Sequence, residues 1–224
     1  MMRGAYRHGV RLLSLGFALL LAGCTSLSLS NFDGLKQAFQ RRPALAPTAA
    51  EVAAKPYYQM LASMPRGDAL LVLGNVDGAR QAWYGADGVI VFLEHGRIVR
   101  TAGLRGNLDA LLPPANDPFL GGLHRLTAPV RYQRVEDWSP GYRYGVQVQA
   151  ELIPAGSDSI EVLGTTHPVL RVEERVEAAA AGYRARNTYW VDARDGFVWK
   201  SEQTVAPEQT LTLVQLRPYR TEAR

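Results

Sequence analysis

The sequence predicts a mainly β protein with a single domain, built on a strongly curved antiparallel meander sheet, or half-barrel, preceded by one or two helices. From residue 69 onward, strand-like runs separated by turn signals recur at intervals of roughly 8–12 residues, which is typical of an antiparallel meander. About eleven such strands cannot lie flat in one small domain, so we expect the sheet to curl. The chain lacks the alternation of strands and helices that nucleotide-binding α/β folds require.

Two helices are expected before the first strand. Phe32, Leu35 and Phe39 recur at helical spacing, which predicts a short amphipathic helix. Thr48 and Glu51 then form a capping-box pattern, in which each side chain satisfies a backbone donor at a helix start. This pattern predicts a second helix over about 49–62, interrupted at Pro56 by a kink or a fresh helical start. Both helices are expected to cover the concave face of the sheet.

Alternating apolar runs and turn residues place the strands. Asp87-Gly88 is a strong hairpin signal because both residues tolerate positive φ. Residues 103–128 are rich in Gly, Pro and Asn, and a connection of this length suggests a functional loop, with one helical turn at 108–112. The expected strands are 69–73, 79–84, 89–93, 97–101, 130–137, 142–151, 158–163, 168–177, 183–192, 197–205 and 209–217.

The first 23 residues have the order of a secretory signal peptide. Three arginines (Arg3, Arg7 and Arg11) precede an apolar run from Leu12 to Leu20, as in a signal with a positive start and a short hydrophobic core. A bilayer crossing takes roughly 20 apolar residues, and this run is much shorter. We therefore expect residues 1–23 to be removed.

The end of this segment, Leu21-Ala22-Gly23-Cys24, resembles the lipobox of bacterial lipoproteins. Cys24 is the only cysteine of the chain, and it is the expected lipidation site, where the sulfur receives a diacylglycerol; the alternative is an ordinary secretory signal with a stray cysteine. The resemblance implies three acyl chains such as palmitate, whereas one chain alone holds a protein only marginally on a membrane. Residues 24–30 would be the lipidated tether and residues 31–224 a single β-rich periplasmic domain.

By resemblance to the sorting rule of enteric-type bacteria, the absence of aspartate after Cys24 places the protein on the periplasmic face of the outer membrane, although exposure outside the cell stays open. The chain has 25 basic and 21 acidic residues, and the signal contains three of the arginines, so the mature chain is nearly neutral. A nucleic-acid partner needs a concentrated basic face, and the interspersed charges exclude one. A single cysteine allows no disulfide within the chain.

The histidines give no catalytic pattern. His95 and His167 are expected in solvent-facing turns, and His124, beside Arg125 in the long loop, is the least explained. No serine lies in a nucleophile elbow, and no metal-ligand spacing occurs. We assign no catalytic residue, metal or cofactor.

The carboxylates give no catalytic pair either. Glu173 and Glu174 are adjacent, so in a strand they point to opposite faces. Asp192 and Asp195 flank a turn, where aspartate commonly accepts backbone hydrogen bonds. A glycoside hydrolase needs two carboxylates across a cleft, and the sequence does not favour such a pair.

Aromatic and arginine side chains are frequent on or beside the predicted strands. Most of the aromatic residues are expected to pack in the core or across strands; the alternative is a stacking surface for sugar rings. Glu136 and Asp137 are expected to form a surface feature. The aromatic residues are Trp83, Tyr84, Trp138, Tyr142, Tyr144, Tyr189, Trp190 and Trp199. An anionic polysaccharide is a conceivable ligand because arginines lie among them: Arg131, Arg134, Arg143, Arg184 and Arg186.

Several segments together resemble the YjbF/GfcB lipoproteins, a family associated with exopolysaccharide and group 4 capsule production. The most specific are Asn187–Asp192, Gly196–Ser201 and Gln203; the others are Leu70–Val76, Gln81–Tyr84, Asp87–Val89, Gly96–Leu104, Asp137–Pro140 and Tyr142–Gly145. The resemblance implies a curved sheet similar to lipoprotein-carrier half-barrels. It also implies partners in polysaccharide export, namely an outer-membrane β-barrel and a periplasmic protein, and it brings no active-site residues.

Three hypotheses follow. The first is a non-enzymatic accessory lipoprotein for exopolysaccharide or capsule production or export. The second is a half-barrel carrier that binds lipid or another hydrophobic ligand in the periplasm. The third is a glycan-modifying enzyme, which would show two close carboxylates in an open cleft.

Overall fold

The computed structural model describes residues 44–220, and a 12-stranded antiparallel sheet dominates this part of the chain. The helix expected at 32–39 and the lipidation site Cys24 lie outside the described residues. The elements are α3 (Ala49–Ala53), β1 (Gln59–Met64), β2 (Gly67–Asp77), β3 (Arg80–Tyr84), the 3₁₀ turn η2 (Ala86–Gly88), β4 (Ile90–Glu94), β5 (Arg97–Ala102), β6 (Asn107–Leu112), η3 (Pro118–Gly121), η4 (Leu123–Arg125), β7 (Val130–Ser139), β8 (Arg143–Val162), β9 (Thr165–Ala178), η5 (Ala179–Ala181), β10 (Tyr183–Asp192), β11 (Val198–Ala206) and β12 (Gln209–Arg217).

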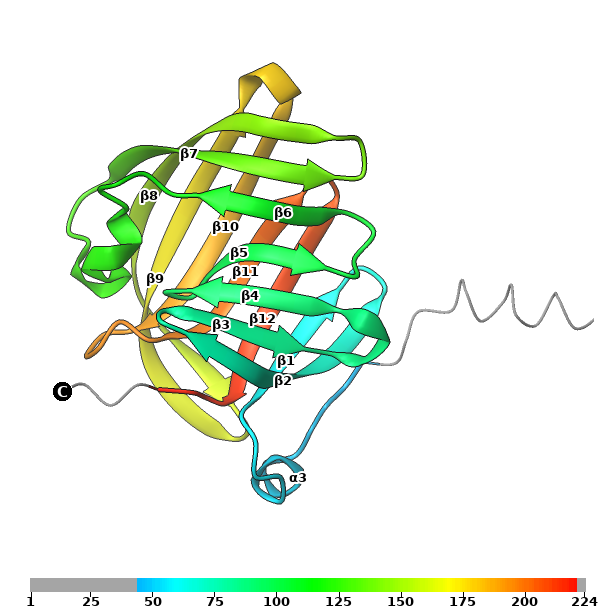
Figure 1. Cartoon of the computed structure of the whole chain (residues 1–224). Coiled ribbons are helices and arrows are strands. Elements are labelled where there is room, and N and C mark those ends of the chain that lie inside the picture. Colours follow the sequence, from blue (N-terminus) through cyan, green and yellow to red (C-terminus); the bar gives the residue numbers. More distant parts are fainter. Residues whose placement is uncertain (1–43, 221–224) are drawn as a thin grey trace, which may run out of the picture. The chain divides into compact units, whose positions relative to one another are not determined.

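The sheet is a meander that wraps into a nearly closed barrel. Its strand order is β5-β4-β3-β2-β1-β12-β11-β10-β9-β8-β7-β6, so every strand pairs with its neighbours in sequence except at β5 and β6. The first strand, β1, pairs with the last strand, β12. The predicted mainly β class and strongly curved meander are confirmed, and the sheet closes further than a half-barrel (Figure 1).

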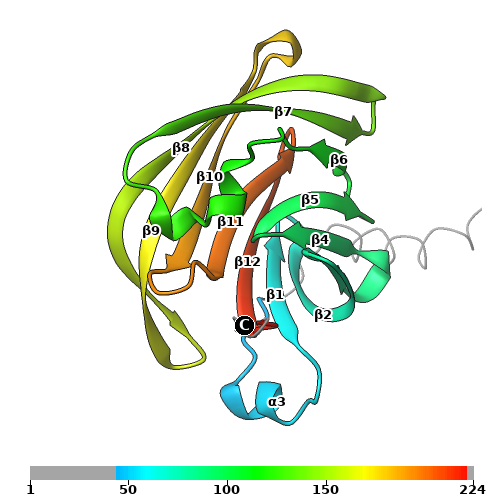
Figure 2. The same ribbon diagram turned by 60° about the vertical axis from the view of Figure 1, so that its left-hand side comes forward.

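The two edge strands, β5 and β6, lie side by side (Figures 1 and 2). Side chains tie this seam together: the Leu108 amide donates to the Thr101 hydroxyl (3.0 Å), and the Leu104 amide donates to Asn107 Oδ1 (3.2 Å). Unpaired edge groups attract other strands. These bonds to side chains therefore satisfy backbone amides that have no partner strand at this seam.

Gln203 of β11 satisfies the inner side of the β5 edge. Its Oε1 accepts from the Ile98 amide (2.9 Å), and its Nε2 donates to the Gly96 carbonyl (3.0 Å). Gly96 has φ +80°, and a Cβ there would overlap Val198. Only glycine therefore allows the β4–β5 turn to approach β11 this closely.

The predicted helix over 49–62 is wrong beyond its first turn. The capping box forms as expected, since the Glu51 amide donates to Thr48 Oγ1 and the Thr48 amide to the Glu51 carboxylate. However, α3 ends at Ala53, and residues 59–64 form β1 between β2 and β12. Figure 1 shows α3 at one end of the sheet rather than over its concave face. Pairing on both sides of β1 outweighs the helical preference of its residues, most of which are good helix formers.

The helical turn expected at 108–112 is also strand, β6. A bulge at Asp109 shifts the pairing with β7 between Leu108 and Ala110. The bulge places Leu108 and Leu111 on the same buried side, three residues apart, which is a helical spacing. The extra residue of the bulge therefore gave the apolar residues of this strand the spacing of a helix.

The two strands expected at 142–151 and 158–163 are one strand, β8. The signal at Pro154-Ala155-Gly156 forms a bulge against β9, where the register shifts between Pro154 and Ser157. Gly156 has φ +88°, so the glycine serves a bend in the strand rather than a turn.

The long loop closes one end of the barrel interior. Phe119 of η3 and Leu123 of η4 are 2% and 3% exposed and pack with Tyr132, Leu152 and residues of β10. The segment 103–128, expected to be a functional loop, thus contains β6 and, after it, an apolar plug formed by η3 and η4, whose Phe119 and Leu123 pack in the core.

Candidate functional site

A layer of polar side chains divides the interior into two apolar clusters. The larger cluster includes Trp83, Trp138 and Leu211, and the smaller one surrounds Tyr189 and the loop plug. On β9, for example, Val176 belongs to the first cluster, Val172 to the second, and Glu174 lies between them. We call these polar residues the interior polar layer; they are Tyr132, Arg134, Glu136, Glu174, Asn187, Tyr189 and Gln203.

Glu174 is the centre of the interior polar layer and is 0% exposed. Its carboxylate accepts from Asn187 Nδ2 (2.7 Å) and the Tyr189 hydroxyl (3.0 Å). It also accepts from the Tyr132 hydroxyl and from the Arg134 guanidinium. Four donors thus surround one buried carboxylate, which satisfies its hydrogen-bonding capacity.

Arg134 connects this carboxylate to a second one. Its Nε donates to Glu136 (2.6 Å), whose other oxygen accepts from Trp138 Nε1 (2.8 Å). The expectation that Glu136 lies at the surface is wrong: it is 4% exposed. The strand alternates strictly here, so Glu136 shares the inward face with Arg134 and Trp138.

The electrostatics keep Glu174 and Arg134 charged. Burial alone would raise the pKa of Glu174, but the positive charge of Arg134 and the donated hydrogen bonds hold that pKa below its ordinary value. Burial likewise opposes the charge on Arg134, and the neighbouring carboxylates of Glu174 and Glu136 nevertheless raise its pKa. Burial and the Glu174 charge raise the pKa of Tyr132. A carboxylate that is ionised and fully bonded has no proton to donate and no free lone pair to act as a base.

A second buried ion pair fixes the plug. Arg97 of β5 contacts Asp117 through both terminal nitrogens, at 3.1 and 2.5 Å, and its guanidinium lies 4.2 Å from the centre of the Phe119 ring. Asp117 also accepts from the Phe119 amide. Sequence reasoning missed this pair, because only the fold brings residues 97 and 117 together.

The histidines form no site. His95 lies exposed in the β4–β5 turn, as expected. His167 is not in a turn: it belongs to β9, and its ring lies 3.9 Å from that of Trp199. His124 packs against Gly196, where a Cβ would overlap its ring.

The remaining carboxylates follow their expected roles. Glu173 is partly exposed while Glu174 is buried, so the adjacent pair does point to opposite faces. Asp192 accepts from the Arg194 amide and Asp195 from the Phe197 amide, both around the β10–β11 turn. The Arg194 side chain bonds to Asp192 and lowers its pKa.

Within residues 44–220, no three side chains of His, Cys, Asp or Glu gather as metal ligands. The same residues contain no helix of the length and apolarity that crossing a membrane demands.

The aromatic residues divide between core and surface. Trp83, Trp138, Tyr189 and Trp199 are buried, as expected for packing, and Trp190 is partly buried. Of the eight aromatic residues singled out in the sequence, three are exposed, at 44%, 85% and 62%: Tyr84, Tyr142 and Tyr144.

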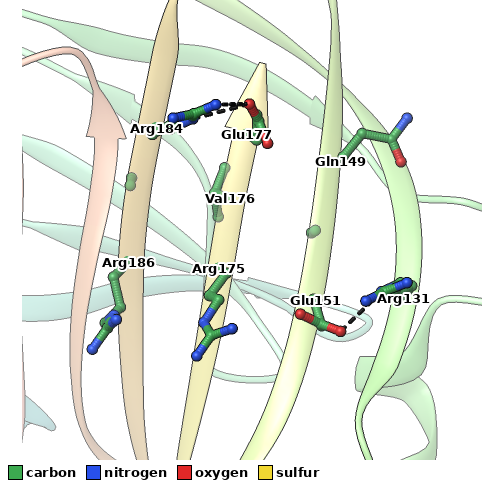
Figure 3. Close-up of a pocket in the computed structure, with 10 residues that line it drawn as sticks. Arg131, Gln149, Glu151, Arg175, Val176, Glu177, Arg184 and Arg186 are labelled. Atoms are coloured by element: carbon green, nitrogen blue, oxygen red, sulfur yellow. Dashed lines mark hydrogen bonds and ion pairs between the residues drawn. The ribbon is translucent and has the colours of Figure 1, made fainter. Parts of the chain in front are cut away.

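On the outer face of β7, β8, β9 and β10, charged side chains line a pocket of about 610 Å³. Figure 3 shows four arginines and two glutamates on β7, β8, β9 and β10, close to one another. We call this the arginine pocket; its charged residues are Arg131, Glu151, Arg175, Glu177, Arg184 and Arg186.

Three of the five arginines singled out in the sequence meet in this pocket, namely Arg131, Arg184 and Arg186. Arg134 instead faces the interior, and Arg143 lies exposed at the start of β8, outside the pocket lining. Sequence reasoning missed Arg175. Its position two residues from Glu173 and Glu177 on the outward face of β9 was the available signal.

The family described as "Group 4 capsule polysaccharide lipoprotein gfcB, YjbF" matches residues 32–216. The chain belongs to the YjbF family. Two members from Escherichia coli K12 are similar to it: lipoprotein GfcB is 25% identical over 84% of this chain and 88% of its own length, and lipoprotein YjbF is 24% identical over 83% and 86%. The crystal structure of the hypothetical lipoprotein YmcC from the same organism has the same fold, with a TM-score of 0.69 and 20% identity over 88% of this chain and all of that one.

The segments that resemble the YjbF family most have a structural role. Asn187 donates to Glu174 and accepts from the Thr204 amide (2.8 Å). Tyr189 bonds to Glu174, and Gln203 supports the edge of β5. The C-terminal hairpin motif therefore contributes three of the seven residues of the interior polar layer.

Proposed function

We propose that this YjbF-family protein is a non-enzymatic accessory factor in exopolysaccharide or capsule production or export. It would be anchored through lipidated Cys24 on the periplasmic face of the outer membrane. The observation that carries the proposal is the match of residues 32–216, nearly the whole predicted mature domain, to a family described as capsule polysaccharide lipoproteins.

The state of the buried carboxylates supports a non-enzymatic role. Glu136 and Glu174 are close enough to share Arg134, but both are buried rather than facing an open cleft, and every carboxylate oxygen of the two accepts a hydrogen bond. A glycosidase needs one carboxylic acid with a raised pKa, and the pKa of Glu174 is lowered.

Partners would be components of polysaccharide export, in particular an outer-membrane β-barrel and a periplasmic protein. The nearly neutral mature chain has no general electrostatic preference, so such partners would recognise local surfaces.

Carriage of a hydrophobic ligand is the second candidate, and the barrel-like sheet with its apolar clusters is the observation that favours it. The interior polar layer weighs against it, because an acyl chain that ran through the barrel would have to displace the ion pairs of Arg134. Mass spectrometry of protein purified from native membranes tests this candidate: co-purified lipid would support carriage, and its absence would contradict it.

Deletion of the gene tests the main proposal. Surface polysaccharide should fall in the deletion strain and return with the wild-type gene. Cys24→Ala should release the protein from the membrane fraction and fail to restore polysaccharide, whereas Ser26→Ala, a control two residues away, should behave as wild type. Unchanged polysaccharide in the deletion strain under inducing conditions would contradict the proposed function.

A further inference from the structure

The arginine pocket contains a pair of like charges that should not stabilise the sheet. Arg175 of β9 and Arg186 of β10 are directly opposite each other on the outer face. Like charges in this arrangement destabilise a sheet. Figure 3 shows the two side chains lying side by side and pointing the same way along their strands.

Compensation for this pair within the described residues is partial: Glu151 lies opposite Arg175 on β8 but forms its ion pair with Arg131. Arg186 reaches Glu173 at 3.5 Å, and none of the ion pairs between residues 44 and 220 involves Arg175. The charged lining has four arginines and two glutamates, so the pocket has excess positive charge although the mature chain is nearly neutral.

The other two arginines are available as well. Arg131 pairs with Glu151 at 2.9 Å and Arg184 with Glu177 at 2.7 Å, but their side chains are 84% and 81% exposed. Ion pairs this exposed contribute about 0–1 kcal/mol each. An anionic ligand could therefore replace the glutamates without a large cost to the fold.

The layout of the pocket suits an extended ligand. Arg131, Glu151, Arg175 and Arg186 form one row across four strands, each opposite the next. With neighbouring strands about 4.8 Å apart, the row spans roughly 14 Å. Gln149, which also lines the pocket, offers an amide that can bond to hydroxyl groups.

A membrane surface fits less well. The large exposed apolar side chains of the described part are Leu45, Tyr57, Tyr58, Val76, Tyr84, Leu112, Leu120, Tyr142 and Tyr144. None of them lines the pocket, so the pocket has no side chain that would insert among lipids.

We propose that the arginine pocket binds an acidic polysaccharide, with Arg175 and Arg186 forming charge-assisted hydrogen bonds to carboxylates along the polymer. This inference rests on the proposed function and names the chemical class of the ligand. Arginine suits this task because its planar guanidinium binds a carboxylate through two parallel bonds.

The test measures binding of the full lipidated protein, in detergent, to polygalacturonate, a polymer of uronic acids. Neutral dextran and glycerol phosphate, the soluble headgroup part of an anionic phospholipid, serve as comparison ligands. Arg175→Gln/Arg186→Gln is the test variant. Arg66→Gln/Arg105→Gln is the matched control, because it removes two exposed arginines outside the pocket and changes the net charge equally.

We expect the test variant to lose at least tenfold in affinity for polygalacturonate and the control to stay within twofold of wild type. Wild-type binding should weaken as salt rises, because exposed charges are screened. Equal binding by the test variant and wild type, no binding by wild type, equal binding of dextran, or binding of glycerol phosphate alone would each overturn the inference. The proposed function would survive these outcomes if deletion of the gene still lowered surface polysaccharide, so the two failures are distinguishable.

Discussion

Strands β7–β10 have arginines on both faces, and the two faces treat them differently. On the inner face, Arg134 is 5% exposed and contacts two carboxylates and a tyrosine hydroxyl. On the outer face, Arg175 and Arg186 lie opposite each other. Residues that follow one another in a strand thus point alternately to the two faces. One belongs to the fully paired interior polar layer and the next to the arginine pocket with its excess positive charge.

The difference shows what each face is built for. A buried charge is tolerated only when it is paired and hydrogen-bonded, and the interior polar layer meets that condition. An exposed charge is solvated by water and does not require such partners, so its position can serve ligand binding rather than folding. Stability should therefore respond to inner-face substitutions and ligand binding to outer-face substitutions.

The largest effect is expected from Glu174→Gln. The substitution leaves Arg134 without its central partner, and breaking a buried ion pair on one side typically costs about 3–5 kcal/mol. Glu177→Gln, three residues along the same strand but on the outer face, removes an exposed pair and should cost at most about 1 kcal/mol. Denaturant unfolding of both variants measures the difference, and equal losses would refute the division between faces.

Gln203→Ala should have the next largest effect. It leaves the Ile98 amide and Gly96 carbonyl of the β5 edge without their partners, and unsatisfied buried groups cost about 1–3 kcal/mol each. The outer-face control is Gln149→Ala, which should change the unfolding free energy by less than about 0.5 kcal/mol. Faster amide exchange at Ile98 in Gln203→Ala would locate the loss at the seam, and unchanged exchange there would contradict this role.

Acid should weaken the inner face first. The pKa of Glu174 is below its ordinary value of about 4.5 in the folded state. A lowered pKa gives stability that is complete above the unfolded value and declines as the pH falls toward the folded one. Unfolding free energy should therefore fall below about pH 4.5, and this dependence should be shallower in Glu174→Gln. A profile of the same slope in both proteins would show that Glu174 is not responsible.

The smallest effect on stability is expected from Arg175→Thr. Removing one member of a like-charged cross-strand pair should leave the unfolding free energy unchanged or raise it by up to roughly 0.5 kcal/mol. The same variant should bind polygalacturonate more weakly. A clear loss of stability in thermal unfolding would instead assign Arg175 a structural role.

The curved meander was predictable because apolar and polar residues alternate with the strand period of two along most of its strands, and turn residues separate them. Strands β1 and β6 were not predictable, since β1 consists mostly of good helix formers and β6 contains a bulge that spaces Leu108 and Leu111 as a helix would. Their strand form depends on neighbours distant in sequence, which local patterns do not report.

The two faces were predictable to different degrees. Strict alternation in β7 places Arg134 and Glu136 on the side of Tyr132 and Trp138, so their burial could have been inferred from parity. The pairing of Arg175 with Arg186, and of Arg97 with Asp117, depends on strand register and loop packing. No motif spacing encodes those contacts.

The most direct test of the central claim measures surface polysaccharide in a deletion strain that produces Arg175→Gln/Arg186→Gln from the native locus. The variant should reach wild-type abundance in the membrane fraction, since the outer face contributes little to folding, yet surface polysaccharide should fall toward the level of the deletion strain. Wild-type amounts of polysaccharide with this variant would contradict the claim that the outer face of β7–β10 is where the protein does its work.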